Sequence, residues 1–206
     1  MSRKNRSGGG SYKRADHYTR RAKNQGYAAR SVFKLEEIQH RTQLLAEGDR
    51  AVDLGCFPGS WSRFAREIVT ERGRLVGVDF DTPQGVDGVF LEGSVMEIEP
   101  AVILEALGGP ADVVLSDMAP RTTGDRYADH IRQMALAERA LYYATELLRP
   151  GGNFVSKVFE GREAQGFTEQ VRARFAKVRR IKPKATRGSS VEFFVIGLDR
   201  LLPQEE

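Results

Sequence analysis

Short apolar runs of strand length alternate with longer stretches of helical periodicity from residue 50 onward. The expected strands cover residues 50–54, 75–79, 89–91, 112–116, 153–159, 178–182 and 191–198. The expected helices cover residues 28–45, 60–70, 97–107, 128–148 and 163–175. This alternation predicts an α/β fold in which helices cover both faces of a mostly parallel sheet. Residues 183–190 are too few for a crossover helix, so we expect the last two strands to form an antiparallel hairpin.

The N-terminal segment offers little that could be buried, since residues 1–26 consist mainly of arginine, lysine, serine and glycine. We therefore expect a flexible basic arm over residues 1–26 and a single domain over residues 27–206. Residues 1–30 hold nine lysine or arginine residues against one acidic residue, Asp16. A second cluster without acidic residues comprises Arg172, Arg174, Lys177, Arg179, Arg180, Lys182, Lys184 and Arg187. The two clusters favour nucleic acid as a partner, although either one alone would also fit a solvated surface.

Composition narrows the class of protein and its location. Hydrophobic residues make up 40% and charged residues 29% of the 206 residues, as in ordinary globular domains. No apolar run is long enough to span a membrane, and the N-terminus lacks the apolar segment of a secretory signal. The single Cys56 and the scattered His17, His40 and His130 form no metal-binding spacing. We expect a cytoplasmic protein without a bound metal ion.

The turn after the first expected strand has features of a cofactor-binding loop. It contains Gly55 and Gly59 in a G-x-x-x-G pattern rather than the three-glycine pattern that holds a pyrophosphate. Asp53 and the lack of lysine or arginine in this turn also argue against a phosphate and favour the amino-acid end of S-adenosylmethionine. Asp79 ends the second strand, where a carboxylate can accept hydrogen bonds from ribose hydroxyls. A plain strand-to-helix turn with an aspartate cap is the alternative for the loop taken alone.

Three charged residues lie at the ends of expected strands. Lys157 and Asp117 fall near the carboxyl ends of their strands, where open α/β sheets bind ligands. Glu192 begins a strand that we expect to be antiparallel, so its first residues should lie beside the last residues of its neighbours. The three side chains are therefore expected to converge on one edge of the sheet. Each alone would also fit an ordinary ion pair.

Together with Lys34, these residues carry a resemblance to a known family. The order Lys34, Asp117, Lys157, Glu192 resembles the K-D-K-E tetrad of the FtsJ-type (RrmJ-like) RNA 2′-O-methyltransferases. The matching motifs occur in order at residues 30–35, 52–55, 58–62, 116–120 and 155–159. The resemblance implies a methyltransferase domain over residues 27–206 with the Rossmann-like fold, a seven-stranded, mostly parallel sheet and an antiparallel last strand. It also implies S-adenosylmethionine as methyl donor and a ribose 2′-hydroxyl of RNA as acceptor.

The resemblance also assigns roles to individual positions. It puts cofactor contacts at Gly59, Trp61, Asp79 and Asp117, and it puts Ser94 where the family usually has an aspartate near adenine. The tetrad takes the catalytic roles. Within it, Lys157 is our choice for the base, and Asp117 and Glu192 are expected to orient Lys157 and hold the ribose.

Several acceptors and two other functions stay open. The resemblance is strongest to enzymes that act on a uridine in the A-loop of large-subunit (23S) ribosomal RNA, and we expect the RNA to be bound by a monomer. Transfer RNA and the messenger RNA cap are alternative acceptors. A non-catalytic RNA-binding protein of the same fold and a nicotinamide-dependent oxidoreductase are the other functions considered.

Overall fold

The computed structural model describes residues 17–188 and 190–202. Its helices are α1 (His17–Asn24), α2 (Val32–Thr42), α3 (Ser60–Val69), α4 (Pro100–Leu107), α5 (Arg126–Leu147) and α6 (Ala164–Arg172). Its strands are β1 (Arg50–Leu54), β2 (Arg74–Asp79), β3 (Val89–Glu92), β4 (Ala111–Ser116), β5 (Leu148–Phe159), β6 (Phe175–Ile181) and β7 (Glu192–Arg200). None of the helices described over these ranges is long and apolar enough to cross a membrane.

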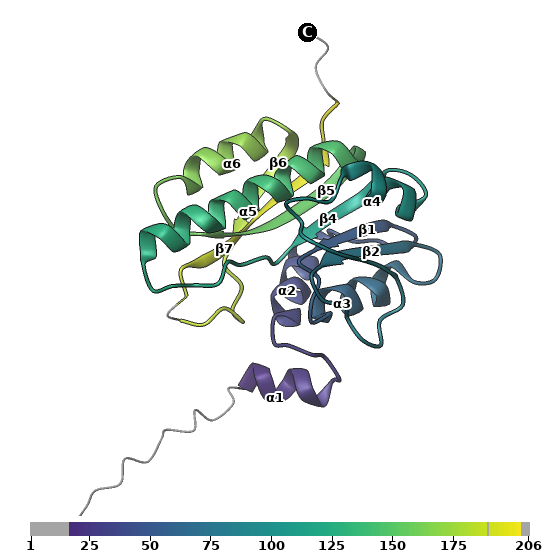
Figure 1. Ribbon diagram of the computed structural model, residues 1–206, viewed down its shortest axis with the longest axis horizontal. Coiled ribbons are helices and arrows are strands. Elements are labelled where there is room, and N and C mark those ends of the chain that lie inside the picture. Colours follow the sequence, from purple (N-terminus) through teal and green to yellow (C-terminus); the bar gives the residue numbers. More distant parts are fainter. Residues whose placement is uncertain (1–16, 189, 203–206) are drawn as a thin grey trace, which may run out of the picture.

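The strands form one seven-stranded sheet in the order β3-β2-β1-β4-β5-β7-β6 (Figure 1). The pairs among β1 to β5 are parallel, whereas β7 is antiparallel to both of its neighbours, β5 and β6. The predicted fold class and the antiparallel final hairpin are therefore confirmed. From β1 the sheet continues to one side with β2 and β3 and to the other side with β4 and β5. Doubly wound sheets bind their ligands at the carboxyl ends of the two strands where the order changes in this way, here β1 and β4.

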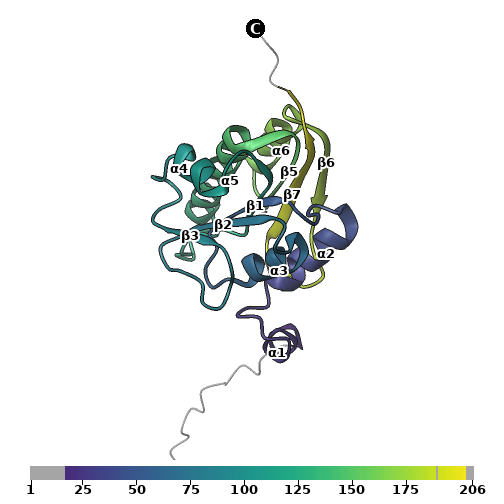
Figure 2. The ribbon, with the colours of Figure 1, turned by 90° about the vertical axis from the view of Figure 1, so that its right-hand side faces the viewer.

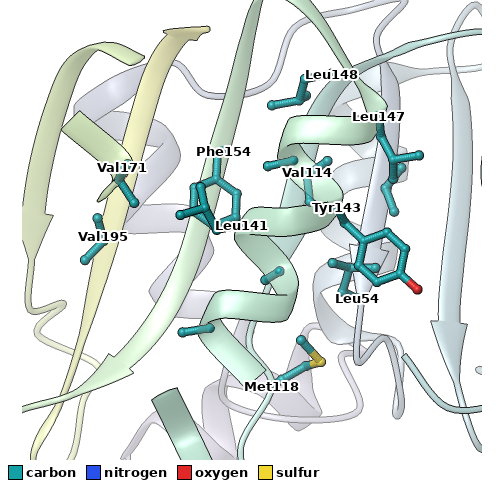
Figure 3. Packing of buried hydrophobic residues seen from close by; sticks show 14 of the residues in the cluster. Leu54, Val114, Met118, Leu141, Tyr143, Leu147, Leu148, Phe154, Val171 and Val195 are labelled. Atoms are coloured by element: carbon teal, nitrogen blue, oxygen red, sulfur yellow. The ribbon is translucent and has the colours of Figure 1, made fainter. Parts of the chain in front are cut away.

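Two hydrophobic layers cover the sheet. Helices α4, α5 and α6 pack on one face, where Leu54, Val114 and Phe154 contact Leu141 and other residues of α5 (Figure 3). Helices α2 and α3 pack on the other face, with α3 contributing Trp61. The central strand β1 is buried on both faces over residues 51–54, as expected for a parallel strand between two helical layers.

The structure differs from the expected flexible arm over residues 17–24, which form α1. Ala22 of this helix is buried against Val32, Phe33 and Ala185, although few other residues of the helix are apolar. The Arg21 guanidinium lies 4.2 Å from the centre of the Phe33 ring. Contacts between arginine and aromatic rings thus help to pack α1, which has no stripe of apolar residues. The hydrophobic pattern of the sequence therefore did not predict this helix. Helix α1 lies below α2 in both views (Figures 1 and 2). Residues 1–16 of the expected arm lie outside the described residues.

Helix α2 is shorter than the expected helix over 28–45. Its last residue is followed by Gln43, which adopts a left-handed conformation with φ 52° and donates its backbone N–H to the Gln39 carbonyl. Leu44 and Leu45 extend the apolar pattern beyond this point and are buried in the core, so the pattern alone overstates the length of the helix.

Candidate active site and its two cavities

The four charged residues of the tetrad meet at the carboxyl edge of the sheet. Lys34 lies in the first turn of α2, Asp117 follows β4, Lys157 lies near the end of β5, and Glu192 begins β7. Side chains alternate between the two faces of a strand. Asp117, Lys157 and Glu192 are each two positions from a residue in the core layer under α2 and α3, namely Leu115, Val155 and Phe194. Strand parity therefore directs all three toward α2.

Ion pairs join the four side chains into one network. The Nζ atom of Lys34 lies 2.5 Å from Glu192 Oε1 and 4.0 Å from Asp117 Oδ1. The Nζ atom of Lys157 lies 3.0 Å from Asp117 Oδ1 and also donates to the Asp117 carbonyl oxygen. Lys157 is only 6% exposed, so this burial is tolerable because its ammonium has oxygen partners. The structure thus brings together the three residues that the strand ends predict to converge, and it adds Lys34, which only the resemblance assigns to the tetrad.

The charge state of Glu192 follows from its surroundings. Burial alone would raise the pKa of this carboxyl, but the Lys34 ammonium, its hydrogen bond and the Lys157 charge outweigh burial and lower the pKa below the usual value. Glu192 is therefore a carboxylate at neutral pH. Its position beside Phe159, the last residue of β5, is set by the antiparallel register.

Sequence reasoning missed a buried glutamine that ties two of the strands together. Gln133 on α5 is 1% exposed, and its Nε2 donates to the Lys157 carbonyl at 2.8 Å and to the Met118 carbonyl at 3.2 Å. These bonds hold the ends of β4 and β5 in register beside Asp117. The available signal was a polar residue on the buried face of a long helix, a position that mostly holds apolar residues in α5.

A cavity of about 520 Å³ opens beside the network at the carboxyl ends of β1, β2 and β4. The residues expected to contact a cofactor that line it are Gly55, Asp79, Ser94 and Asp117. Apolar residues that the sequence did not single out also line it, among them Phe57, Phe80, Met96 and Met118. Phe80 is 68% exposed, an unusual state for a large apolar side chain. The cavity therefore combines an apolar surface with carboxylates.

Asp79 and Gly55 shape the floor of this cavity. The two carboxylate oxygens of Asp79 accept the backbone N–H groups of Phe57 at 2.9 Å and Phe80 at 2.7 Å. Each oxygen keeps a further lone pair for a ligand. Gly55 has φ 76°, and a Cβ at this position would lie 2.5 Å from Met118 Cγ. Only glycine permits both the conformation and the close approach.

Asp53, Gly59 and Trp61 are not among the described residues that line the cavity. The Asp53 carboxylate is buried and accepts the Ser62 hydroxyl at 2.5 Å. Burial is the main cause that raises its pKa to about 7, and Asp117 and Asp79 add to the rise. Trp61 donates its Nε1 hydrogen to the Ser31 carbonyl at 3.0 Å. In the structure these residues support the loop and helix α3, and direct contact with a cofactor stays a prediction.

The loop that carries Ser94 is held from α5. Its Val95 carbonyl accepts hydrogen bonds from Arg139 Nε at 3.0 Å and from the Tyr143 hydroxyl at 2.9 Å. Arg139 Nη2 also donates to the Ile98 carbonyl at 3.3 Å. The Ser94 hydroxyl oxygen accepts the Met96 backbone N–H at 3.2 Å. Sequence reasoning missed both α5 residues, because their partners are backbone carbonyls.

A second cavity of about 350 Å³ borders the same network. Lys34 and Glu192 line it together with Arg30, Ser31, Ala185, Arg187 and Ser190. Asp117 lines the first cavity, and its carboxylate lies 4.0 Å from Lys34. The charged network therefore borders two cavities. The larger one is mainly apolar with the Asp79 and Asp117 carboxylates and the Arg121 guanidinium, and the smaller one has Arg30, Arg187 and Lys34 beside Glu192.

Comparison with known proteins agrees with this architecture. The model of the FtsJ-like methyltransferase family matches residues 27–200. The chain is 48% identical over 193 residues to ribosomal RNA large subunit methyltransferase E of Syntrophobacter fumaroxidans, covering 91% of this chain and 97% of the relative. It is 44% identical over 185 residues to the protein of the same name from Desulfatibacillum aliphaticivorans, covering 88% and 89%.

A crystal structure of a Plasmodium falciparum protein assigned as a ribosomal RNA methyltransferase has the same fold. Its TM-score is 0.74 at 22% identity, and the match covers 85% of this chain and 99% of that one. The family model covers all four residues of the charged network, and the two bacterial relatives each cover most of the chain. The chain belongs to the FtsJ-like methyltransferase family.

Proposed function

We propose that this protein transfers a methyl group from S-adenosylmethionine to a ribose 2′-hydroxyl of RNA. The names of the bacterial relatives support large-subunit ribosomal RNA as the acceptor. Within it, we favour a uridine in the A-loop, as the motif resemblance implies. The observation that carries the proposal is the buried network of Lys34, Asp117, Lys157 and Glu192, which borders two cavities. A non-catalytic RNA-binding protein would have no need to bury four charges there.

The larger cavity fits S-adenosylmethionine in size and chemistry. Its volume lies within the usual range of about 300–1,000 Å³ for small-molecule sites. Asp79 can accept the two ribose hydroxyls of the cofactor, and the apolar side chains around Phe80 and Met96 suit the flat adenine ring. Ser94 offers the adenine amino group an uncharged acceptor, which is weaker than a carboxylate. Asp117 faces this cavity and contacts Lys157, so it links the cofactor site to the catalytic group.

The network supplies alignment and a proton acceptor. S-adenosylmethionine supplies an electrophilic methyl carbon when it is bound. Asp117 and Glu192 hold Lys157 and Lys34 in fixed positions, which restricts the acceptor ribose to an aligned geometry. The bond between the 2′-oxygen and the methyl carbon would form as the methyl–sulfur bond breaks and the sulfur leaves as a neutral thioether. In the proposed role, the neutral amine of Lys157 takes the proton of the 2′-hydroxyl in this step.

RNA suits the smaller cavity and the basic surface around it. Arg30 and Arg187 line this cavity, and Lys182, Lys184 and Arg179 lie on or near β6 at the adjacent edge of the sheet. Clustered positive charge of this kind binds phosphate backbones. We further propose that the protein acts as a monomer in the cytoplasm, where unmodified large subunits are available.

One experiment tests activity and acceptor together. Purified protein is incubated with S-adenosylmethionine carrying a labelled methyl group and with free ribosomal RNA, intact large subunits or transfer RNA. The modified nucleotide is then mapped by mass spectrometry. We expect label on one ribose of large-subunit ribosomal RNA. Label on a base, or on transfer RNA alone, would contradict the proposal.

A further inference from the structure

Two arginines face the smaller cavity from different parts of the chain. Arg30 precedes α2, and Arg187 lies in the loop between β6 and β7. The same cavity is lined by Lys34 and Glu192, so both guanidinium groups border the space next to the catalytic network. Burial and the positive charge of Arg187 lower the pKa of Arg30, and the Glu192 carboxylate only partly opposes them. Three cations, those of Arg30, Arg187 and Lys34, thus border the cavity with one carboxylate, so an anion bound there would be favoured.

Contacts within the protein hold the two segments that contain Arg30 and Arg187 in place. Arg30 Nη2 donates to the Ala185 carbonyl, and its guanidinium lies 5.4 Å from the centre of the Tyr18 ring. The loop that bears Arg187 is anchored to α2, because the backbone N–H of Lys184 donates to Glu37 Oε2 at 2.7 Å. Ala185 is buried against Val32 and Phe33 of α2 and Ala22 of α1. The site is therefore built by the segment from α1 to α2 and by the β6–β7 loop, which is distant from it in sequence.

The chemistry of the acceptor determines which anion belongs there. In RNA, the carbon that carries the 2′-hydroxyl is bonded to the carbon that carries the 3′-phosphate. Any ribose whose 2′-oxygen lies at the network therefore brings a phosphodiester close to it. We propose that Arg30 and Arg187 bind the phosphodiester on the 3′ side of the acceptor ribose and thereby align its 2′-hydroxyl. This inference rests on the proposed RNA 2′-O-methyltransferase function.

Arg172 and Arg180, two other arginines of the basic cluster, form ion pairs with carboxylates. Arg172 lies 2.5 Å from Glu169, and Arg180 lies 3.1 Å from Glu160. Neither arginine is among the described residues that line the smaller cavity, and exposed ion pairs of this kind contribute little. Arg172 therefore provides a matched control, since its loss removes the same charge from the same basic cluster without touching the cavity.

The test compares Arg187→Gln, Arg30→Gln and Arg172→Gln with the wild type on unmodified large ribosomal subunits. Arg187 is exposed, so its variant is expected to fold even if loss of the Arg30 contacts disturbs the Arg30→Gln protein. We expect the first two variants to raise KM for RNA about tenfold each, because a charge-assisted hydrogen bond is removed. The dissociation constant of S-adenosylmethionine is expected to stay unchanged. Arg172→Gln is expected to change KM less than twofold.

A synthetic RNA separates this site from general charge attraction. Once the modified nucleotide is mapped with the wild type, the phosphodiester on its 3′ side is replaced by a neutral methylphosphonate. We expect this RNA to raise KM of the wild type about tenfold but to leave KM of Arg187→Gln nearly unchanged, because both changes remove the same interaction. If the KM increases caused by Arg187→Gln and by the methylphosphonate simply multiplied, the two changes would be independent and the assignment would be overturned. The assignment would also be overturned if only a methylphosphonate on the 5′ side of the nucleotide showed this non-additivity. Wild-type activity on the ordinary RNA shows separately whether the proposed function itself holds.

Discussion

The Nζ atom of Lys34 lies 2.5 Å from Oε1 of Glu192, so an ion pair joins the first turn of α2 to the first residue of β7. Both side chains are largely buried, with 11% and 13% of their surface exposed. A buried ion is strongly destabilised when its partner is removed. The pair therefore fixes the two side chains where they line the smaller cavity.

Glu192→Gln should slow methyl transfer without abolishing it. The amide keeps the shape of the side chain but leaves the Lys34 ammonium without its nearest negative charge. We expect the single-turnover rate at saturating substrates to fall about 10- to 100-fold, corresponding to the removal of a charged hydrogen bond. Glu160→Gln, which removes a carboxylate from the exposed pair with Arg180, serves as the control and should retain the wild-type rate. A Glu192→Gln protein as fast as the wild type would contradict this role.

Lys157→Ala should eliminate methyl transfer while leaving cofactor binding intact. Lys157 is the proposed base, and loss of a general base typically costs about 10²–10⁴-fold in rate. It is not among the described residues that line the larger cavity, whereas Asp117 is. We therefore expect Asp117→Ala to lose both transfer and affinity for S-adenosylmethionine. Isothermal titration calorimetry separates the two cases.

The control for the lysine variant is Lys177→Ala. Lys177 forms an exposed ion pair with Asp199 on β7, and exposed pairs contribute little. This protein should transfer methyl groups at the wild-type rate when RNA is saturating. If purified Lys157→Ala retained full activity, the assignment of the base would be wrong.

The sequence could predict much of this site because strand parity and strand ends determine where a side chain points. Lys157 and Glu192 follow from that rule once β7 is recognised as antiparallel. Only the family resemblance identified Lys34 as a site residue, because the pattern of an amphipathic helix does not indicate which edge of the sheet the helix covers. Strand parity also places Asp53 on the face of the sheet toward α3. Only the structure shows that its carboxylate accepts a hydrogen bond from the Ser62 hydroxyl.

Tyr143→Phe should weaken cofactor binding from a distance. The Tyr143 hydroxyl and Arg139 together hold the Val95 carbonyl in the loop that carries Ser94 and Met96 into the larger cavity. Removing the hydroxyl leaves a buried carbonyl with one fewer donor, which typically costs about 1–3 kcal/mol. We expect the dissociation constant of S-adenosylmethionine to rise several-fold while KM for RNA is unchanged.

Tyr142→Phe is the matched control for this prediction. Tyr142 is the preceding residue, is 42% exposed and also stacks with Arg139 at 4.7 Å. The Tyr142→Phe protein should bind S-adenosylmethionine as the wild type does. Equal affinities of the Tyr143→Phe and wild-type proteins would show that the loop does not depend on this hydroxyl.

Asp53 should make stability depend on pH in an uncommon direction. Burial raises its pKa to about 7, against about 3.9 in an unfolded chain. The folded state therefore binds the proton more strongly, and this residue's contribution to the free energy of unfolding falls as pH rises from about 4 to about 7. The difference corresponds to on the order of 4 kcal/mol.

Asp53→Asn removes this titration. We expect the difference in free energy of unfolding between the wild type and this variant to shift in favour of the variant between pH 4.5 and pH 8, as measured by urea denaturation. Asp199→Asn, at an exposed ion pair, should show no such shift. A difference independent of pH would mean that Asp53 is ionised throughout.

Deleting the N-terminal segment should affect RNA binding and stability separately. Residues 1–16 contain five of the basic residues, Arg3, Lys4, Arg6, Lys13 and Arg14, and their deletion should weaken RNA affinity and flatten its salt dependence. Deleting residues 1–26 also removes Ala22 and the stacking of Arg21 on Phe33. This longer deletion should therefore unfold at a lower temperature than the shorter one. Filter binding over a series of salt concentrations and thermal unfolding measure the two effects. An unchanged salt slope would exclude phosphate binding by the segment, because each phosphate that the protein no longer neutralises should reduce the slope by about 0.7 for single-stranded RNA.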